Sequence, residues 1–271
     1  MSVNCDLRIS WWQEILIKIL SSGLKITHFA VVMDGNRRFA RKLQQKSELG
    51  HKKGSKKFFK MLNMAAILGI QELTVYAFSV ENFKRPADEL QDFMSLILKI
   101  LQKMLDNIEE YKAKGIKFTF IGELHLIDEE CQKYFQKLMK ATEENSDFLC
   151  NIAVAYASRV EITRAIKNAV QNPKTLSEDV DHEVLEEFLY IPKGRPVDLW
   201  LRTSGETRFS DFLTWQSDKA VMHFSPVLWP EFGAWDLSAF TSYERAFSPF
   251  FYGSWSSTIK ASEYNSLDKC D

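Results

Sequence analysis

A run of polar residues, Asp34–Arg38 (DGNRR), directly follows the apolar run Phe29–Met33. Where a strand leads into a helix, the first helical turn presents unpaired backbone N–H groups and a positive dipole end to an anion. Gly35 lets the backbone approach such an anion closely, and the Asp34 carboxylate can hold a hard cation such as Mg²⁺. The pattern therefore predicts a diphosphate site with a metal ligand built into it.

Positive charge gathers behind this turn, although the whole chain is near neutral. Ten Lys or Arg residues and one Glu fall between positions 36 and 60, whereas the 271 residues together carry a net charge of −1. A Lys-rich stretch is often only a solvated helix face, but this one lies where open α/β sheets bind ligands. A sequence pI of about 6.5 and the lack of a nucleic-acid motif argue against nucleic acid as the partner.

Two further polar groups follow apolar runs, at residues 72–78 and 197–201. They contain Ser79, Asn82, Phe83 and Arg85 in the first case, and Arg202, Arg208 and Ser210 in the second. Guanidinium and hydroxyl groups suit phosphate oxygens. Singly these signals are weak, because a strand-end Ser often caps a helix and a lone histidine such as His51 is often structural. Taken together, they suit two diphosphates and one cation.

Six apolar, β-rich runs alternate with helical patterns, which predicts a single α/β domain with a central, mainly parallel six-stranded sheet. The expected strands are Ile26–Met33, Glu72–Phe78, Ile116–Ile121, Phe148–Ala155, Val197–Leu201 and Ala220–Phe224. The clearest helical pattern spans Asp88–Lys114 and ends at Gly115. By pattern alone, its broad apolar face predicts packing against the core.

The segment Trp11–Leu20 (WWQEILIKIL) has apolar residues on one helical face and charged residues on the other. It suits either the surface of a membrane or packing on the domain, and both interpretations stay open. No apolar stretch approaches the ~20 residues that a membrane-spanning helix needs. Four cysteines without a close pair, and no Asn-x-Ser/Thr acceptor, fit a reducing, cytosol-facing compartment.

Several other chemistries lack their sequence signatures. The chain has no Gly-x-x-x-x-Gly-Lys-Ser/Thr, Gly-x-Gly-x-x-Gly or His-Glu-x-x-His motif, which argues against NTPase, dinucleotide and zinc-peptidase functions. The best alternative is a hydrolase with Ser204 as its nucleophile, because Thr203-Ser204-Gly205 follows a predicted strand. The first glycine of the nucleophile-elbow pattern is missing, however, and Arg202 lies close by.

Four segments together closely resemble the cis-prenyltransferases, in the form of the eukaryotic dehydrodolichyl diphosphate synthases. They are residues 28–41 (HFAVVMDGNRRFAR), 78–85 (FSVENFKR), 201–216 (LRTSGETRFSDFLTWQ) and 227–232 (VLWPEF). The resemblance covers about residues 25 to 250, in order and at family spacing, so it is more specific than any short motif. It implies that the sheet and its helices enclose an apolar tunnel, with the 88–114 helix as a wall that faces an isoprenoid tail.

The resemblance also implies a reaction and a set of residue roles. The reaction is stepwise cis addition of isopentenyl diphosphate to an allylic diphosphate, with farnesyl diphosphate as the expected primer and Mg²⁺ as the cofactor. Its product would be a long-chain polyprenyl diphosphate for dolichol synthesis and protein glycosylation. The matched catalytic positions are Asp34, His51, Ser79 and Asn82, with Asp34 also the expected metal ligand. The matched substrate-binding positions are Gly35, Asn36, Arg37, Arg38, Phe39, Phe83, Arg85, Arg202, Arg208 and Ser210. The identity of the base stays open.

The resemblance further implies a domain division and a partner. Residues 25–250 would form the catalytic domain, between a possibly membrane-associating segment, residues 1–24, and a tail, residues 251–271. In homodimeric relatives, a C-terminal Arg-x-Gly helps to bind diphosphate in the neighbouring active site. This sequence contains no Arg-x-Gly, and no arginine follows Arg245. We therefore expect a heteromer with a non-catalytic homologue that ends in Arg-x-Gly, bound peripherally to the cytosolic face of the endoplasmic reticulum. The alternatives are a homodimer, or a role for this chain itself as a non-catalytic stabilising subunit.

Overall fold

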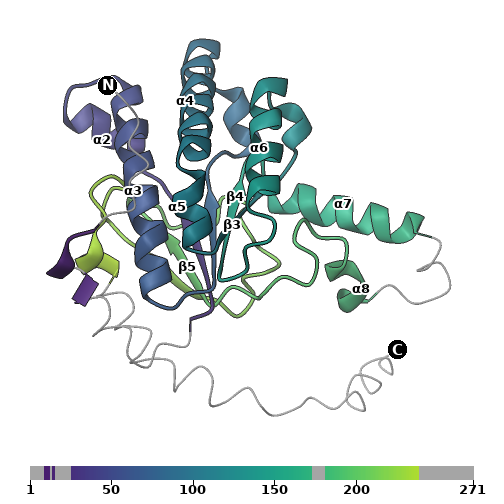
Figure 1. Ribbon diagram of the computed structural model, residues 1–271. Coiled ribbons are helices and arrows are strands. Elements are labelled where there is room, and N and C mark those ends of the chain that lie inside the picture. The colour runs from purple at the N-terminus through teal and green to yellow at the C-terminus, as the bar shows by residue number, and fades with distance from the viewer. Residues whose placement is uncertain (1–8, 13, 16–25, 173–180, 238–271) are drawn as a thin grey trace, which may run out of the picture.

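A six-stranded parallel sheet lies at the centre of the computed structural model, which describes residues 9–12, 14–15, 26–172 and 181–237 (Figure 1). Its strands are β1 His28–Val32, β2 Glu72–Tyr76, β3 Ile116–Ile121, β4 Phe148–Ala153, β5 Leu199–Arg202 and β6 Val221–Phe224. Their order is β3-β4-β2-β1-β5-β6, and every neighbouring pair is parallel. The six predicted strands are confirmed, each to within two residues at either end. The single α/β domain is confirmed as well.

The central strands are buried on both faces. Every residue of β1, β2 and β5 is buried, as expected for parallel strands that helices cover on both sides. This is why continuous apolar runs, and not alternating ones, marked these strands in the sequence. The polar exceptions are His28 in β1, Glu72 and Thr74 in β2 and Arg202 in β5, and β4 adds the buried Asn151. The Asn151 amide donates to Glu72 at 2.7 Å, so part of this buried polar group is satisfied within the sheet.

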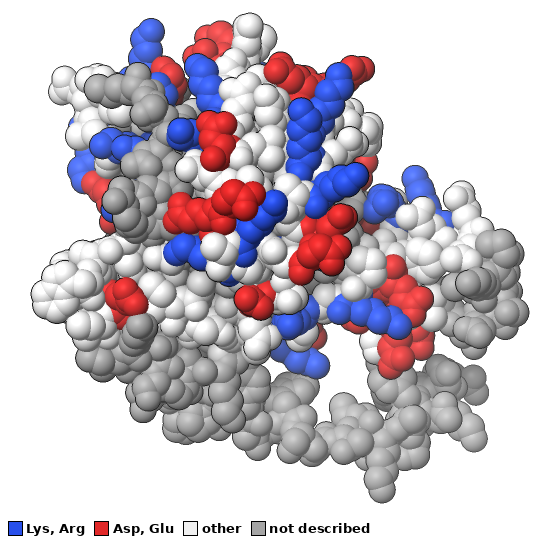
Figure 2. All heavy atoms as spheres, in the orientation of Figure 1, with Lys and Arg blue, Asp and Glu red and all other residues white. Residues whose placement is uncertain are grey.

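Helices surround the sheet. They are α2 Asn36–Lys42, α3 Ser47–Ile67, α4 Ala87–Asp106, α5 Ile108–Ala113, α6 Glu129–Ala141, α7 Ser158–Gln171 and α8 His182–Glu186, with short 3-10 helices at Val80–Lys84 and Leu124–Leu126. Figure 1 shows α3, α4 and α6 standing side by side, in agreement with their contacts, whereas α7 and α8 lie to one side. Acidic and basic side chains are interspersed over the outer faces of these helices in Figure 2, so this face carries no patch of a single sign.

The predicted helix Asp88–Lys114 is wrong in one respect, because it is two helices. Helix α4 ends at Asp106, and α5 begins at Ile108. Between them, the Asn107 side-chain amide donates to the Lys103 carbonyl at 2.7 Å, while its backbone N–H is shared between Lys103 and Met104. Asparagine side chains compete with the backbone in this way and interrupt helices.

The sheet register sets where the functional residues meet. Val32 pairs with both Tyr76 and Arg202, and Tyr76 pairs in turn with Ala153. The last residues of four strands therefore lie in one row. The segments that follow β1, β2 and β5, which carry the polar groups found in the sequence, emerge at the same edge of the sheet.

Only part of the N-terminal segment lies among the described residues. Trp11 and Trp12 are helical and exposed, and the Trp12 ring lies 6.4 Å from that of Trp235. Residues 16–20 of the predicted amphipathic helix and the tail from residue 238 onward, including Arg245, lie outside the described residues. Within the described part of the chain, no helix is both long enough and apolar enough to span a bilayer.

Candidate active site

A cavity of about 730 Å³ opens at the carboxyl edge of the sheet. One part of it is apolar and runs between the sheet and helices α3 and α4. This part is lined by Phe58, Phe93, Leu96, Ile97, Ile100, Leu101, Met104, Phe120, Phe135, Ile152 and Val154. One face of α4 lines the cavity, which is the place expected of a tunnel wall. That face also packs with the core, as its apolar pattern predicted.

The other part of the cavity is polar and is built around Asp34 and Arg202. Arg202 Nη2 donates to Asp34 Oδ2 at 2.9 Å, and its Nη1 donates to the Arg208 carbonyl and to Ser210 Oγ, each at 2.5 Å. The Arg202 side chain is only 4% exposed, whereas Asp34 is 34% exposed. Arg202 is therefore fixed in place, and it leaves the Asp34 carboxylate facing the cavity.

A second set of charges lies beside the first. Arg38 donates to Glu206 Oε1 at 2.9 Å, and Arg208 pairs with the other oxygen of the same carboxylate. Arg38 also lies 4.0 Å from Asp34 Oδ2. The charged side chains of Arg202, Asp34, Arg38, Glu206 and Arg208 thus form a continuous chain at the polar end of the cavity.

The loop after β5 reaches the cavity through an unusual backbone. Ser204, Ser210 and Asp211 have φ values of 80°, 52° and 59°. Non-glycine residues adopt such positive φ values rarely, and those that do cluster at functional sites. Ser204 is 3% exposed, and its hydroxyl accepts a hydrogen bond from the Arg38 guanidinium. A buried hydroxyl bonded to a guanidinium lacks the adjacent general base that a hydrolytic nucleophile needs.

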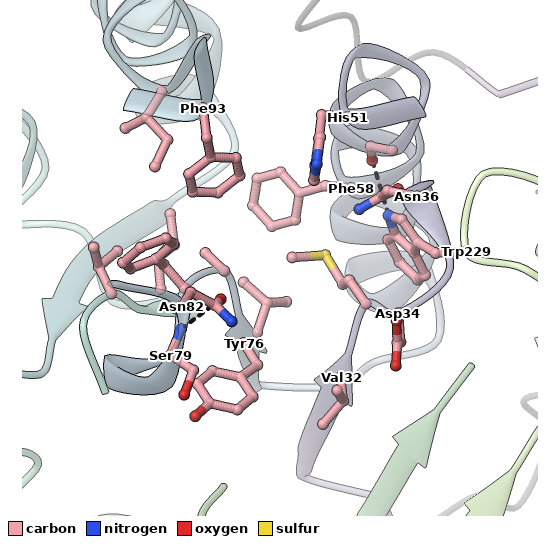
Figure 3. Close-up of a pocket in the computed structure, with 18 of the residues that line it drawn as sticks. Val32, Asp34, Asn36, His51, Phe58, Tyr76, Ser79, Asn82, Phe93 and Trp229 are labelled. Atoms are coloured by element: carbon pink, nitrogen blue, oxygen red, sulfur yellow. Dashed lines mark hydrogen bonds between the residues drawn. The ribbon is translucent and has the colours of Figure 1, made fainter. Parts of the chain in front are cut away.

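Asn36 and His51 line the cavity, and each has a buried polar atom without a hydrogen-bond partner, namely Asn36 Oδ1 and His51 Nε2. Burial, reinforced by the Arg85 and Arg37 guanidinium groups, lowers the pKa of His51 to about 4. His51 is therefore neutral at pH 7. Unpaired buried polar atoms are uncommon, and here both belong to residues that line the cavity. Figure 3 shows His51, Asn36 and Asp34 on one side of that space, opposite Ser79 and Asn82.

Gly54 makes the position of Asn36 possible. A Cβ at residue 54 would lie 2.2 Å from Asn36 Oδ1, and the Gly54 carbonyl accepts a hydrogen bond from Trp229 Nε1 at 2.9 Å. Close packing between helices α2 and α3 at this point thus requires a residue without a side chain.

The segment after β2 forms the opposite wall. Ser79 begins a 3-10 helix, where its hydroxyl accepts from the Glu81 backbone and its own N–H donates to Asn82 Oδ1 at 3.1 Å. Ser79 is therefore both a helix cap and a cavity residue. The Arg85 guanidinium lies 6.0 Å from the centre of the Phe93 ring, and burial lowers its pKa.

The structure brings together twelve of the fourteen site residues expected from the sequence. The lining of the cavity includes Asp34, Gly35, Asn36, Arg37, Arg38, His51, Ser79, Asn82, Arg85, Arg202, Arg208 and Ser210. Phe39 and Phe83 do not line it. Phe39 is half-buried on α2, and Phe83 packs edge-on against Phe78 with ring centres 5.0 Å apart.

Sequence reasoning missed Glu206 and Arg159, which also line the cavity. Glu206 lies inside the motif 201–216, between Arg202 and Arg208. A carboxylate flanked by two arginines in the sequence was the signal that could have indicated it as a site residue. Arg159, at the start of α7, donates from Nε to Asp211 at 3.0 Å. No pattern in the sequence around residue 159 pointed to the cavity.

Comparisons with known proteins agree with this geometry. A family model described as "Putative undecaprenyl diphosphate synthase" matches residues 32–248. A Homo sapiens protein, dehydrodolichyl diphosphate synthase complex subunit DHDDS, is 35% identical over 232 residues, which are 84% of this chain and 70% of that protein. A tritrans,polycis-undecaprenyl-diphosphate synthase (geranylgeranyl-diphosphate specific) of Archaeoglobus fulgidus is 37% identical over 231 residues, which are 83% of this chain and 91% of that protein.

Solved structures show the same similarity. Lavandulyl diphosphate synthase from Lavandula x intermedia, in complex with dimethylallyl diphosphate, superposes with a TM-score of 0.73 at 27% identity, over 81% of this chain and 95% of the other. A probable undecaprenyl diphosphate synthase from Campylobacter jejuni gives a TM-score of 0.68 at 27% identity, over 82% and 96% of the two chains. The six-stranded parallel sheet, the amphipathic cavity and these similarities lead to one conclusion: the chain belongs to the undecaprenyl diphosphate synthase family of cis-prenyltransferases, and it is a transferase.

Proposed function

We propose that this chain adds isopentenyl diphosphate units in cis to an allylic diphosphate, with farnesyl diphosphate as the primer, and so makes a long-chain polyprenyl diphosphate for dolichol synthesis and protein glycosylation. One observation carries the proposal: a single cavity joins a guanidinium-rich end to an apolar wall on α4. Diphosphates suit the first part, because charge-assisted guanidinium bonds hold phosphate oxygens. A growing isoprenoid tail suits the second, because apolar surface gains free energy on leaving water.

The residues at the polar end divide into two expected binding groups. Arg38 and the backbone at Gly35 and Asn36 would bind the allylic diphosphate, while Arg202, Arg208 and Ser210 would bind isopentenyl diphosphate. When the allylic C–O bond breaks, negative charge grows on the departing diphosphate. Donors that are already in position stabilise that charge without having to reorganise. Arg38, which the Ser204 hydroxyl and the Glu206 carboxylate hold at the cavity, belongs to the group expected to bind this diphosphate.

Mg²⁺ is the proposed cofactor, and the residues present fit it. The described part of the chain contains no cluster of three or more His, Cys, Asp or Glu side chains that could hold a metal ion by themselves. Mg²⁺ does not need such a cluster, since it usually binds one or two carboxylates together with substrate phosphates and water. Asp34 supplies an accessible carboxylate oxygen beside the guanidinium groups. When bound, the ion would neutralise charge on the leaving diphosphate.

The relatives' names support the product class and leave the primer to be tested. The human relative is named as a dehydrodolichyl diphosphate synthase subunit, whereas the archaeal relatives are named as specific for geranylgeranyl diphosphate. The test is a competition in which labelled isopentenyl diphosphate is supplied with geranyl, farnesyl or geranylgeranyl diphosphate in turn. We expect the highest kcat/KM with farnesyl diphosphate. A clear preference for either of the other primers would overturn this assignment.

A second subunit and a membrane complete the proposal. The human relative's name places it in a complex, and this chain has no Arg-x-Gly, which supports a heteromer with a homologue that supplies one. Peripheral attachment to the cytosolic face of the endoplasmic reticulum is supported by the exposed Trp11, Trp12 and Ile15, because tryptophan favours the bilayer interface. Deletion of residues 1–20 should reduce co-sedimentation with liposomes. Unchanged co-sedimentation would mean that this segment packs on the domain and does not bind the membrane.

The alternative function is that of a non-catalytic stabilising subunit. Such a subunit would be free to lose its diphosphate-binding charges. Here Asp34, Arg38, Arg202 and Arg208 are all present and connected, which favours the catalytic role.

A further inference from the structure

Arginines at the polar end of the cavity are held in two different ways. Arg202 is almost fully buried and bonded on three sides. Arg38 and Arg208 are 39% and 63% exposed, and both pair with the Glu206 carboxylate, while Arg38 also donates to the Ser204 hydroxyl. An ion pair between groups that reach solvent is weak and exchanges readily with other partners. The shared contact of Arg38 and Arg208 with Glu206 is therefore one that a diphosphate can replace, whereas the contacts of Arg202 are fixed.

We infer that Glu206 is an internal anion that occupies Arg38 and Arg208 in the free protein and couples the binding of the two diphosphate substrates. The inference rests on the proposed function, which assigns Arg38 to the allylic diphosphate and Arg208 to isopentenyl diphosphate. Glu206 presents one carboxylate oxygen to each of these arginines. It thus bridges the two expected binding groups and is a positioning residue, since it acts through the arginines and not on the reacting atoms.

The sign of the coupling follows from the geometry. The first diphosphate to bind takes one arginine away from Glu206 and repels its carboxylate. Glu206 is then held by a single exposed ion pair, which contributes little, so it leaves the second arginine free. The second diphosphate consequently binds the second arginine without having to displace the Glu206 carboxylate. Binding of either substrate should strengthen the other, and by linkage the factor must be equal in both directions.

The size of the effect is bounded by the contacts involved. An exposed ion pair changes an equilibrium constant by about fivefold at most. We therefore expect a coupling factor of about fivefold, at the lower end of the range typical of allosteric coupling, which is about 5- to 150-fold.

The variant Glu206→Gln removes the charge and keeps the shape of the side chain. Glu81→Gln is the matched control, because Glu81 also lines the cavity but pairs with Lys84 and touches neither arginine. Titration calorimetry on the full chain, with Mg²⁺ present, would measure isopentenyl diphosphate binding with and without saturating farnesyl thiolodiphosphate, whose C–S bond does not ionise. Thermal melts of all three proteins would confirm that they are folded.

In the wild type and in Glu81→Gln, the analogue should tighten isopentenyl diphosphate binding by about fivefold more than it does in Glu206→Gln. Glu206→Gln alone should already bind isopentenyl diphosphate about fivefold more tightly than the wild type. Retention of the wild-type coupling factor in Glu206→Gln would overturn the inference. An equal loss of the coupling factor in Glu81→Gln would overturn it too, because removal of any negative charge from the cavity would then have the same effect. Failure of the wild type to bind either ligand would instead overturn the proposed function.

Discussion

The Asp34 carboxylate and the Arg202 guanidinium meet at the carboxyl ends of neighbouring strands β1 and β5, with Oδ2 2.9 Å from Nη2. They are 168 positions apart in the sequence. Because Arg202 is 4% exposed and Asp34 is 34% exposed, the pair has one buried member and one that faces the cavity. It connects the fold to the proposed chemistry, since the same carboxylate that neutralises a buried cation also faces the cavity.

Asp34→Asn should lower turnover by at least ~10²-fold while leaving the protein folded, since removal of one electrostatic element from a preorganised site has an effect of this size. Asparagine retains an oxygen that can accept from Arg202. Alanine is a less informative change, because it leaves a buried guanidinium unpaired, which costs up to ~3–5 kcal/mol. Turnover and the thermal melt should be measured together. Near-normal turnover in the folded variant would exclude Asp34 from the central role.

Arg208→Ala should weaken isopentenyl diphosphate binding by roughly tenfold or more, because hydrogen bonds to charged groups contribute ~1.5–3 kcal/mol. Allylic binding should change less. Stability should hardly change, since the side chain is 63% exposed. Separate titrations with isopentenyl diphosphate and with an unreactive allylic analogue would measure the two affinities. Equal losses for both ligands would mean that the two binding groups are misassigned.

Ile97→Trp should shorten the products. Ile97 lines the apolar part of the cavity from α4, and a larger side chain there takes up space that the growing tail would use. Lys99→Trp places the same residue on the exposed side of the same helix and should leave the product length unchanged. Chromatographic sizing of labelled products compares the two variants. An unaltered distribution in Ile97→Trp would argue that the tail takes another path.

His51 should make stability depend on pH. Its pKa in the folded protein is about 4, below the ordinary value of 6.5, mainly because of burial. The unfolded chain therefore takes up a proton here first as the pH falls. The contribution of the neutral imidazole is complete above about pH 6.5 and is lost progressively as the pH falls toward 4.

Between pH 7 and pH 5, the wild type should thus lose roughly 1–2 kcal/mol of unfolding free energy more than His51→Gln, at about 1.36 kcal/mol for each pKa unit. Urea unfolding of both proteins at the two pH values gives this difference directly, because changes from other titrating groups are common to both. Parallel pH profiles would show that His51 is not held in its neutral form by the fold.

The strands were predictable because their residues are buried on both faces. Phe29, Ala30 and Val31 of β1 are each 0% exposed, and such continuous apolar runs can be seen in the sequence without knowing what packs on them. The site was predictable for a related reason. Its polar groups follow strands directly, and the carboxyl ends of parallel strands meet at one edge of the sheet.

Features that depend on individual side-chain directions were not predictable. Successive helical residues differ in direction by about 100°, so Arg38 can line the cavity while Phe39 does not. The break at Asn107 depends on one side-chain hydrogen bond to Lys103. The role inferred for Glu206 depends on its carboxylate also reaching Arg38, which is 168 positions away, and no local pattern records that long-range pair.

The central claim is that this chain is a prenyl-chain elongase. The most direct measurement incubates the purified protein with farnesyl diphosphate, labelled isopentenyl diphosphate and Mg²⁺, alone and together with a non-catalytic homologue that ends in Arg-x-Gly, and sizes the labelled products. We predict weak incorporation by the chain alone and strong stimulation by the homologue, with long-chain polyprenyl products that disappear when Asp34→Asn replaces the wild type. Full specific activity without a partner would contradict the heteromer. Absence of labelled polyprenyl products in both incubations, or unchanged products with Asp34→Asn, would contradict the claim that this chain performs the elongation.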